Sequence, residues 1–180
     1  MRIYFYVVTG LGDYIPPAYV KTRKDSIFYY YAKLVVCDSA GFKGKGAQLY
    51  KMTWHVFNKL KTGKMKMSDR NREYRKQMLS KNVCAYCGEP SNALDHVLAR
   101  RIGGPEGALN EVKSCRKCNS SKGKKDLVAW WLMRHHNADD IPRVPIGIYL
   151  KYSYEWNRLN DSLDVLANGI EDLRPFKSGK

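Results

Sequence analysis

The chain has 180 residues, of which 44% are hydrophobic and 12% aromatic, so it has enough apolar material for a folded core and is not a disordered chain. Its 32 Lys and Arg outnumber its 17 Asp and Glu, giving a net charge of +15, and the excess lies in residues 41–81 (net +10) and 98–126 (net +5). A localised basic excess suits a polyanion, most simply a nucleic-acid backbone, although a solubilising surface or an anionic membrane surface would carry the same charge.

The first forty residues predict a strand followed by a segment of ambiguous structure. Residues 3–8 alternate aromatic and aliphatic side chains, as a strand does, and lack the cleavage pattern of a secretory signal. Residues 10–17 form a loop. Residues 26–36 suit a buried helix or a strand, because a run of three tyrosines obscures the periodicity. No apolar run is long enough to span a membrane, so we expect a cytoplasmic protein without a membrane partner.

Two helices are predicted after the Gly- and Lys-rich loop 38–46. Residues 48–60 place apolar side chains on one face, at positions 49, 52, 53, 56, 57 and 60, and Lys51, His55 and Lys59 on another. Residues 70–81, which Ser68 or Asp69 can cap, form a helix rich in Arg and Lys. This helix either contacts a nucleic-acid backbone or is simply solvated.

Four of the five cysteines form two pairs with two residues between partners. The spacing lets both thiolates of a pair reach one metal, and 27 residues separate the pairs, so the sequence predicts one structural zinc with four sulfur ligands. Gly88 supplies the conformational freedom that the first turn needs. Two disulfides or a redox pair are the alternatives, and the fifth cysteine, Cys37, is most simply a buried small apolar residue. The predicted ligands are Cys84, Cys87, Cys115 and Cys118.

A group of Asp, His and Asn residues lies between and just after the cysteine pairs. Asp95 and His96 are adjacent in a short apolar stretch, and on a strand they would point to opposite faces unless a bulge intervenes. A basic, Gly-rich loop follows, and then come Asn110 before the second pair and Asn119 directly after it. A lone histidine here would more often be structural, but this combination favours a catalytic site.

The run DHVLARRIGG…NEVKSCRKCNSSKG resembles the HNH, or ββα-metal, endonuclease family, in particular the members with two CxxC zinc knuckles. The resemblance covers about residues 83–126. It implies a β-hairpin and a helix around one divalent ion, and hydrolysis of phosphodiester bonds that leaves 5′-phosphate ends.

The resemblance also implies roles for individual residues. Asp95 and Asn119 would bind the catalytic ion, His96 would be the general base, and Asn110 would orient His96 or brace the loop. Many members have His at the position of Asn119, and the carboxamide oxygen suits Mg²⁺ or Mn²⁺ rather than a catalytic zinc. Candidate phosphate contacts, for which a solvated surface is the alternative, are Arg100, Arg101, Lys122, Lys124 and Lys125.

The last fifty residues are predicted to be largely helical and carry no net charge. A helix begun within the cysteine block continues over 127–136, with at most one of Trp130 and Trp131 facing the core. His135 and His136 cap its end, and residues 137–145 form a loop. Residues 152–168 form a final helix closed by Asn168 and Gly169, and the tail after residue 174 is frayed.

These features predict an α+β protein built on a zinc-stabilised ββα centre. Residues 1–81 would form a basic extension for nucleic-acid binding or dimerisation, 82–136 the nuclease core, and 137–180 a C-terminal helical extension. We expect a metal-dependent DNA endonuclease from a restriction, defence or phage setting, acting as a homodimer where both strands of a duplex are cut. The alternative, a zinc ribbon that binds nucleic acid without cutting, leaves the Asp, His and Asn constellation unexplained.

Overall fold

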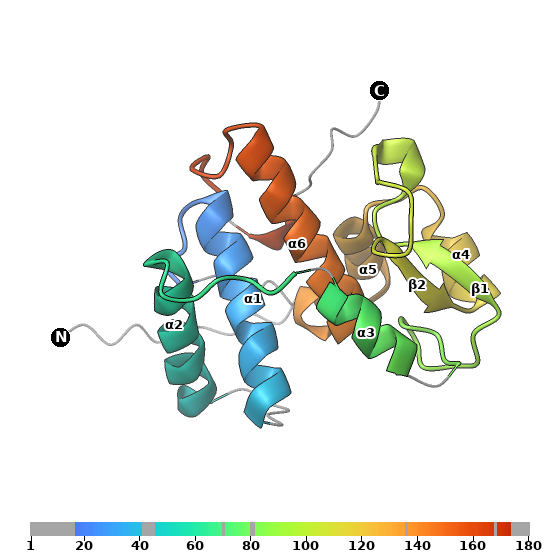
Figure 1. The fold of residues 1–180 in the computed structure, drawn as a ribbon, viewed down its shortest axis with the longest axis horizontal. Coiled ribbons are helices and arrows are strands. Elements are labelled where there is room, and N and C mark those ends of the chain that lie inside the picture. Colours follow the sequence, from blue (N-terminus) through green and yellow to red (C-terminus); the bar gives the residue numbers. More distant parts are fainter. Residues whose placement is uncertain are drawn as a thin grey trace.

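The computed structural model describes residues 17–40, 46–69, 71–79, 82–135, 137–167 and 169–173, with the side chains of 39, 40 and 77–79 left aside. Helices α1, α2 and α6 gather on one side, and the small sheet with α4 and α5 lies on the other, with α3 between them (Figure 1). The expected strand 3–8, most of the loops 10–17 and 38–46, His136, Asn168 and the tail lie outside the described residues.

Helix α1 (Arg23–Ala40) settles the ambiguity of the tyrosine-rich segment, which is helical. Eight consecutive residues, 25–32, are buried because α2 packs against one side of α1 and α6 against another. A helix covered on several sides needs no polar face, so the periodicity that identifies an amphipathic helix is absent from its sequence.

Helix α2 (Ala47–Lys61) confirms the predicted amphipathic helix almost residue for residue. Thr53, Phe57 and Leu60 are buried, whereas the side chains that we placed on the other face, at 51, 55 and 59, are exposed. Its hydrophobic stripe faces α1.

Helix α3 (Asn71–Leu79) is the predicted basic helix, and Asp69 caps it by accepting a hydrogen bond from the amide of Arg72 at 3.3 Å. A buried carboxylate holds it in place. Oε1 of the fully buried Glu73 accepts hydrogen bonds from Arg143 Nη1 at 2.8 Å and Lys151 Nζ at 2.9 Å, both on α6.

The expected continuous helix after the second cysteine pair is wrong, since the chain makes two helices, α4 (Arg116–Lys122) and α5 (Leu127–His135). Asp126 starts α5, because its Oδ1 accepts hydrogen bonds from the amides of Val128 and Ala129 at 3.0 and 3.1 Å.

Both tryptophans of α5 are buried, which corrects the expectation that only one faces the core. Trp130 contacts the ring of Tyr86 and donates to Ser121, whereas Trp131 donates to the carbonyl of Asn137. Other parts of the chain pack on more than one side of α5, so two adjacent side chains can both be buried. His135 stacks on Trp131 with ring centroids 4.0 Å apart.

The predicted final helix is also misplaced, since α6 spans Arg143–Leu159 and a short 3-10 turn, η2 (Ala138–Asp140), precedes it. Pro145 suggested a loop from the sequence. It lies in the first turn of α6, where the backbone amide has no helical partner and a proline costs little. A second turn, η3 (Ile170–Leu173), packs against α1 and α5. Among the described residues, no helix has the length and apolarity needed to cross a membrane.

Candidate active site and zinc centre

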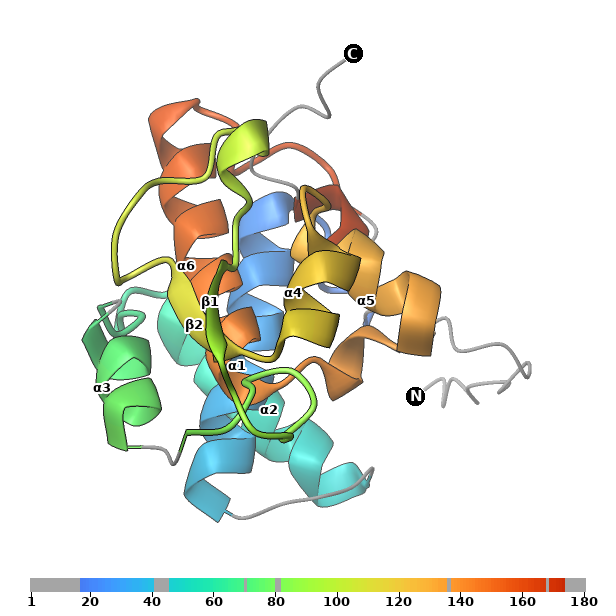
Figure 2. The ribbon, with the colours of Figure 1, turned by 90° about the vertical axis from the view of Figure 1, so that its right-hand side faces the viewer.

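The centre of the site is a hairpin with one helix against it. Strands β1 (Ala93–His96) and β2 (Glu111–Ser114) are antiparallel, and α4 follows β2 directly and packs on β1 (Figure 2). The register pairs Ala93 with Ser114, Asp95 with Val112 and His96 with Glu111. This ββα arrangement is the one that the sequence predicts.

The four predicted zinc ligands meet at one point. Their Sγ atoms all lie within 4.8 Å of one another, and the Sγ atoms of Cys87 and Cys115 are 3.8 Å apart. Tetrahedral zinc with Zn–S bonds of about 2.3 Å places its sulfurs about 3.8 Å apart. The cluster therefore fits one zinc ion, and since all five cysteines are free thiols the disulfide alternative is wrong.

Local backbone geometry shapes both knuckles. Gly88 has φ +80, a conformation that favours glycine, and its amide donates to the carbonyl of Cys84 at 3.0 Å. Cys115 caps α4, and its Sγ accepts from the amide of Cys118 at 3.4 Å. Burial alone would raise the pKa of the Cys84 thiol, but hydrogen bonds from the backbone of Cys115, Cys87 and Tyr86 lower that pKa to about 7. Thiolate formation, which zinc binding needs, is thus favoured at this position.

Asp95 is buried and held from two directions. Its Oδ2 accepts a 2.5 Å hydrogen bond from the hydroxyl of Tyr86, and Nζ of Lys122 lies 3.1 Å from the same oxygen and 3.4 Å from Oδ1. Lys122 also donates to the carbonyl of His96 at 2.6 Å. These bonds fasten the last turn of α4 to β1 and fix the carboxylate without using all of its lone pairs.

His96 follows Asp95 in a strand whose register with β2 has no bulge, so their side chains alternate between the two faces. Asp95 is buried, and the His96 side chain is 21% exposed. Nε2 of His96 lies 3.4 Å from Oε1 of Glu111, its cross-strand neighbour. That is ion-pair distance for a protonated imidazole, but the direction makes no hydrogen bond, so this buried nitrogen has no hydrogen-bond partner among the described residues.

The two asparagines have different surroundings. Nδ2 of Asn119, on α4, donates to the carbonyl of Leu94 at 3.0 Å, which fixes the amide and leaves its oxygen as the available end. Asn110 is fully buried, and its side chain bonds both the amide and the carbonyl of Leu98, at 3.0 and 2.9 Å, and the carbonyl of Pro105 at 2.8 Å. Its contacts hold the loop between β1 and β2.

The loop between β1 and β2 also contains the glycine pair of the motif, Gly103 and Gly104. A Cβ on Gly104 would lie 1.9 Å from the carbonyl oxygen of Leu98, so only glycine allows the two stretches of backbone to approach. Gly103 ends a short 3-10 turn, η1 (Arg100–Ile102), with φ 92.

Four of the five candidate phosphate contacts are exposed around the hairpin, and the fifth is not. Arg100 pairs with Glu106 at 3.0 Å, with 63% and 76% of the two side chains exposed, which is a weak surface contact that a phosphate can replace. Lys122 is fully buried against Asp95, so its expected contact with a nucleic-acid backbone is not supported by its position. The exposed members are Arg100, Arg101, Lys124 and Lys125.

Sequence reasoning missed two side chains of the site and misplaced one cysteine outside it. Tyr86 lies inside the first cysteine pair, and only folding brings its hydroxyl to Asp95; burial and that carboxylate raise its pKa well above the ordinary value. Glu111 becomes a neighbour of His96 only through the strand register. Cys37, expected in the core, is exposed.

The segment from Cys84 to Lys125 matches the family model described as HNH endonuclease. The match spans 42 of the 180 residues and includes both knuckles, the hairpin and α4. Together with the cysteine cluster it confirms the predicted HNH resemblance and the α+β class, and the family consists generally of nucleases. Comparisons with curated proteins and with solved structures found no significant match.

Proposed function

We propose that the chain is a metal-dependent endonuclease that hydrolyses DNA phosphodiester bonds at the ββα centre. The observation that carries the proposal is the placement of Asp95, His96 and Asn119 on one hairpin and helix within the HNH segment. A zinc ribbon that only binds nucleic acid needs the cysteines, but it does not account for an imidazole, a buried carboxylate and a carboxamide within the same hairpin and helix.

His96 would act as the general base that takes a proton from the attacking water. Nε2 lies 3.4 Å from the carboxylate of Glu111 without hydrogen-bond alignment, and a rotation of the ring would let an Nε2 proton face that carboxylate and leave Nδ1 with the lone pair that abstraction requires. Glu111 would then be a positioning residue that selects the tautomer, and Asn110 would act at a distance by holding the loop that follows His96.

Two protein oxygens would hold the catalytic divalent ion, one from the carboxylate of Asp95 and one from the carboxamide of Asn119. Two oxygen ligands of this kind suit Mg²⁺ or Mn²⁺, which keep several sites for water and phosphate. When bound, such an ion would neutralise charge that develops on the phosphate. The structural zinc would hold the two ends of the hairpin together.

Basic side chains would hold the DNA backbone beside the site. Arg100 and Arg101 lie in the turn after β1, and Lys124 and Lys125 follow α4, whose last turn contacts His96, so exposed positive charge lies beside this end of β1. The basic segment 41–81 adds contacts that do not depend on sequence. Residues 1–81 would be the binding or dimerisation extension, and 137–180 the C-terminal extension that supports it.

Cleavage would release 5′-phosphate ends, and a homodimer would be needed to cut both strands of a duplex at one position. A restriction, defence or phage setting would suit such an enzyme.

A plasmid assay with matched histidine variants tests the proposal. Supercoiled plasmid is incubated with Mg²⁺, Mn²⁺ or EDTA and with the wild type, His96→Ala or His55→Ala. We expect nicking that needs the divalent ion, that falls about 10²- to 10⁴-fold in His96→Ala, and that falls far less in His55→Ala, whose histidine is exposed on α2 outside the hairpin.

Gel shifts by both wild type and His96→Ala, with no cutting of duplex, branched or single-stranded DNA, would replace the nuclease by the zinc-ribbon binding module. Equal loss in both histidine variants would show that the effect is not specific to the hairpin.

A further inference from the structure

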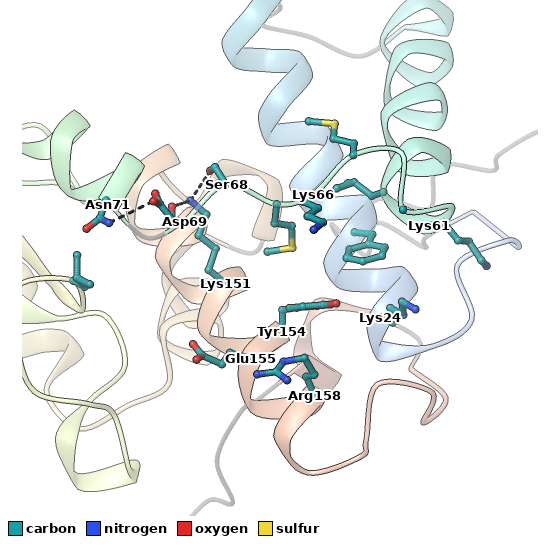
Figure 3. Close-up of a pocket in the computed structure, with 16 residues that line it drawn as sticks. Lys24, Lys61, Lys66, Ser68, Asp69, Asn71, Lys151, Tyr154, Glu155 and Arg158 are labelled. Carbon is teal, nitrogen blue, oxygen red and sulfur yellow. Dashed lines mark hydrogen bonds between the residues drawn. The ribbon is translucent and has the colours of Figure 1, made fainter.

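A hollow lies where the helical group meets the hairpin loop. It has a volume of about 670 Å³ and is lined by α1, α6 and the segment between α2 and α3 (Figure 3). Leu109, which precedes the loop-bracing Asn110, contributes to its wall. We call it the junction cavity, because it borders the same loop that connects the two strands of the HNH centre.

The junction cavity has a surplus of positive charge. Five basic side chains line it, against the carboxylates of Asp69 and Glu155. Two of the five are already compensated, since Lys61 pairs with Asp25 at 2.9 Å and Lys151 with Glu73 at 2.9 Å. The other three make no ion pair with any residue in the described ranges, and they are Lys24, Lys66 and Arg158.

Aromatic side chains form part of the same lining. The rings of Phe28 and Tyr154 are stacked with centroids 5.5 Å apart and an interplanar angle of 24°, and Lys24 lies 5.9 Å from the centre of the Phe28 ring. Figure 3 shows Tyr154 close to Arg158, with Lys24 and Lys66 grouped around the same hollow. Phe28 is buried, so Tyr154, which is partly exposed, is the ring that a ligand can reach.

We propose that the junction cavity binds one unpaired nucleotide of the DNA strand that is cut at the HNH centre; this rests on the proposed function. The base would stack on Tyr154, and the flanking phosphates would contact Lys66 and Arg158. Aromatic platforms combined with unpaired cations are the way proteins hold single strands. Pockets of roughly 300–1,000 Å³ suit small organic groups, so the volume is sufficient for one nucleotide.

The assignment favours a single strand over an intact duplex. A base inside a duplex is covered by its stacked neighbours and cannot place its face on a ring recessed between helices. The substrate class would thus be DNA with an unpaired stretch next to the scissile bond, such as a flap, a branch or a locally opened duplex.

Binding without cleavage tests this site on the full, zinc-loaded chain. Fluorescence anisotropy with a labelled 12-nucleotide strand and the matching duplex, without added Mg²⁺, compares the wild type with Lys66→Gln/Arg158→Gln. The control is Lys59→Gln/Lys64→Gln, which removes two exposed charges outside the cavity.

We expect the cavity double variant to bind the single strand about tenfold more weakly, with a salt slope smaller by about 1.4 for two lost phosphate contacts, while its duplex binding changes less than about twofold. The control removes charge from the basic segment 41–81 and should weaken single-strand and duplex binding to the same extent.

A second variant tests the base rather than the phosphates. Tyr154→Leu keeps an apolar side chain on Phe28 and should lose about tenfold in affinity for the 12-nucleotide strand. It should lose none for a strand of the same length made of abasic sites, because no base remains to stack. Circular dichroism and the unfolding midpoint verify that each variant is folded.

Wild-type affinity for the single strand in both cavity variants would overturn the assignment, as would a loss in the lysine control that is equally selective for the single strand. Displacement of the labelled strand by free dAMP as readily as by unlabelled strand would indicate a small-ligand site and would also overturn it. The two proposals fail separately. If the wild type cuts no DNA but the cavity variants lose affinity for the single strand, the cavity proposal stands and the nuclease proposal fails. If the wild type cuts DNA and the cavity variants keep their affinity, the nuclease proposal stands and the cavity proposal fails.

Discussion

The ion pair between Asp95 and Lys122 decides the local structure of the hairpin. Lys122 has no exposed surface, and burial lowers its pKa while Asp95 opposes that shift. Two opposite charges placed together inside a protein cost desolvation energy, and removal of one leaves the other uncompensated. The pair makes α4 dependent on β1, and it explains why a lysine in a basic run does not reach the surface.

Replacing Lys122 by Met should destabilise the protein by about 3–5 kcal/mol, because Asp95 then stays buried with only the hydroxyl of Tyr86 as a partner. Urea unfolding in buffer without Mg²⁺ measures the change. Lys124→Met, two residues away on the exposed surface, is the matched control and should shift stability by less than about 0.5 kcal/mol. Similar stability in the two variants would contradict the buried pair.

At the scale of elements, ion pairs and close packing hold α3 against α6. Glu73 bonds Arg143 and Lys151, and Asp38 on α1 pairs with Lys76 and Arg143, so that one ionic network joins three helices. Burial would raise the pKa of Asp38, but hydrogen bonds and charge from Lys76 and Arg143 lower it below its ordinary value. The helix that carries the basic face is thus positioned by its acidic residue.

Gly147 permits that approach from α6. A Cβ at this position would lie 2.5 Å from both Arg143 Nη1 and Glu73 Oε1, whose side chains are locked in the network. Alanine normally stabilises a helix interior relative to glycine by about 1 kcal/mol. We expect the opposite sign here, a loss of about 1–3 kcal/mol from overpacking, measured by urea unfolding.

The control for this substitution is Gly46→Ala at the start of α2, where φ is 171 and a Cβ meets nothing within 4 Å. It should cost less than about 1 kcal/mol, because only the preference of the N-cap position for glycine over alanine is lost. Stabilisation by Gly147→Ala would mean that α3 does not pack on α6 as described.

At the scale of the whole molecule, the helical group and the zinc centre share one set of buried residues. Tyr29 and Tyr31 of α1, Tyr149 of α6 and Trp130 of α5 belong to a single core cluster that also contains Cys84. Tyr86, between the first two ligands, packs edge-on against Trp130 at 5.1 Å. Loss of zinc should therefore destabilise the packing of the core as well as the two knuckles.

Replacing Cys87 by Ser should reduce bound zinc from one ion per chain to well below one, because three sulfurs bind it more weakly than four. Elemental analysis measures the metal. Tryptophan fluorescence should show an earlier unfolding transition, since Trp130 loses its ordered neighbour. Cys37→Ser, at an exposed cysteine outside the cluster, should keep both zinc and stability. Full zinc occupancy in the Cys87 variant would contradict the four-sulfur site.

Some features could be predicted because their determinants are close together in the chain. The cysteine spacing is local to each knuckle, and α2 shows its buried face in fifteen residues. The order of Asp95, His96 and Asn119 is a motif within a segment of 42 residues. The break between α4 and α5 was missed because capping by Asp126 competes with a continuous periodic pattern. The segment of α1 stayed ambiguous between helix and strand because burial on several sides removes the periodic pattern.

By itself, the sequence determined the two cysteine pairs, the order of Asp95, His96 and Asn119 and the basic character of its first two thirds, since spacing, residue chemistry and charge are properties of the chain. Only the tertiary structure decided that Lys122 turns inward to Asp95, that Glu111 faces His96, and that Glu73 anchors α3. These are partnerships between residues from 15 to 78 positions apart. Their energies depend on burial, which no local pattern encodes.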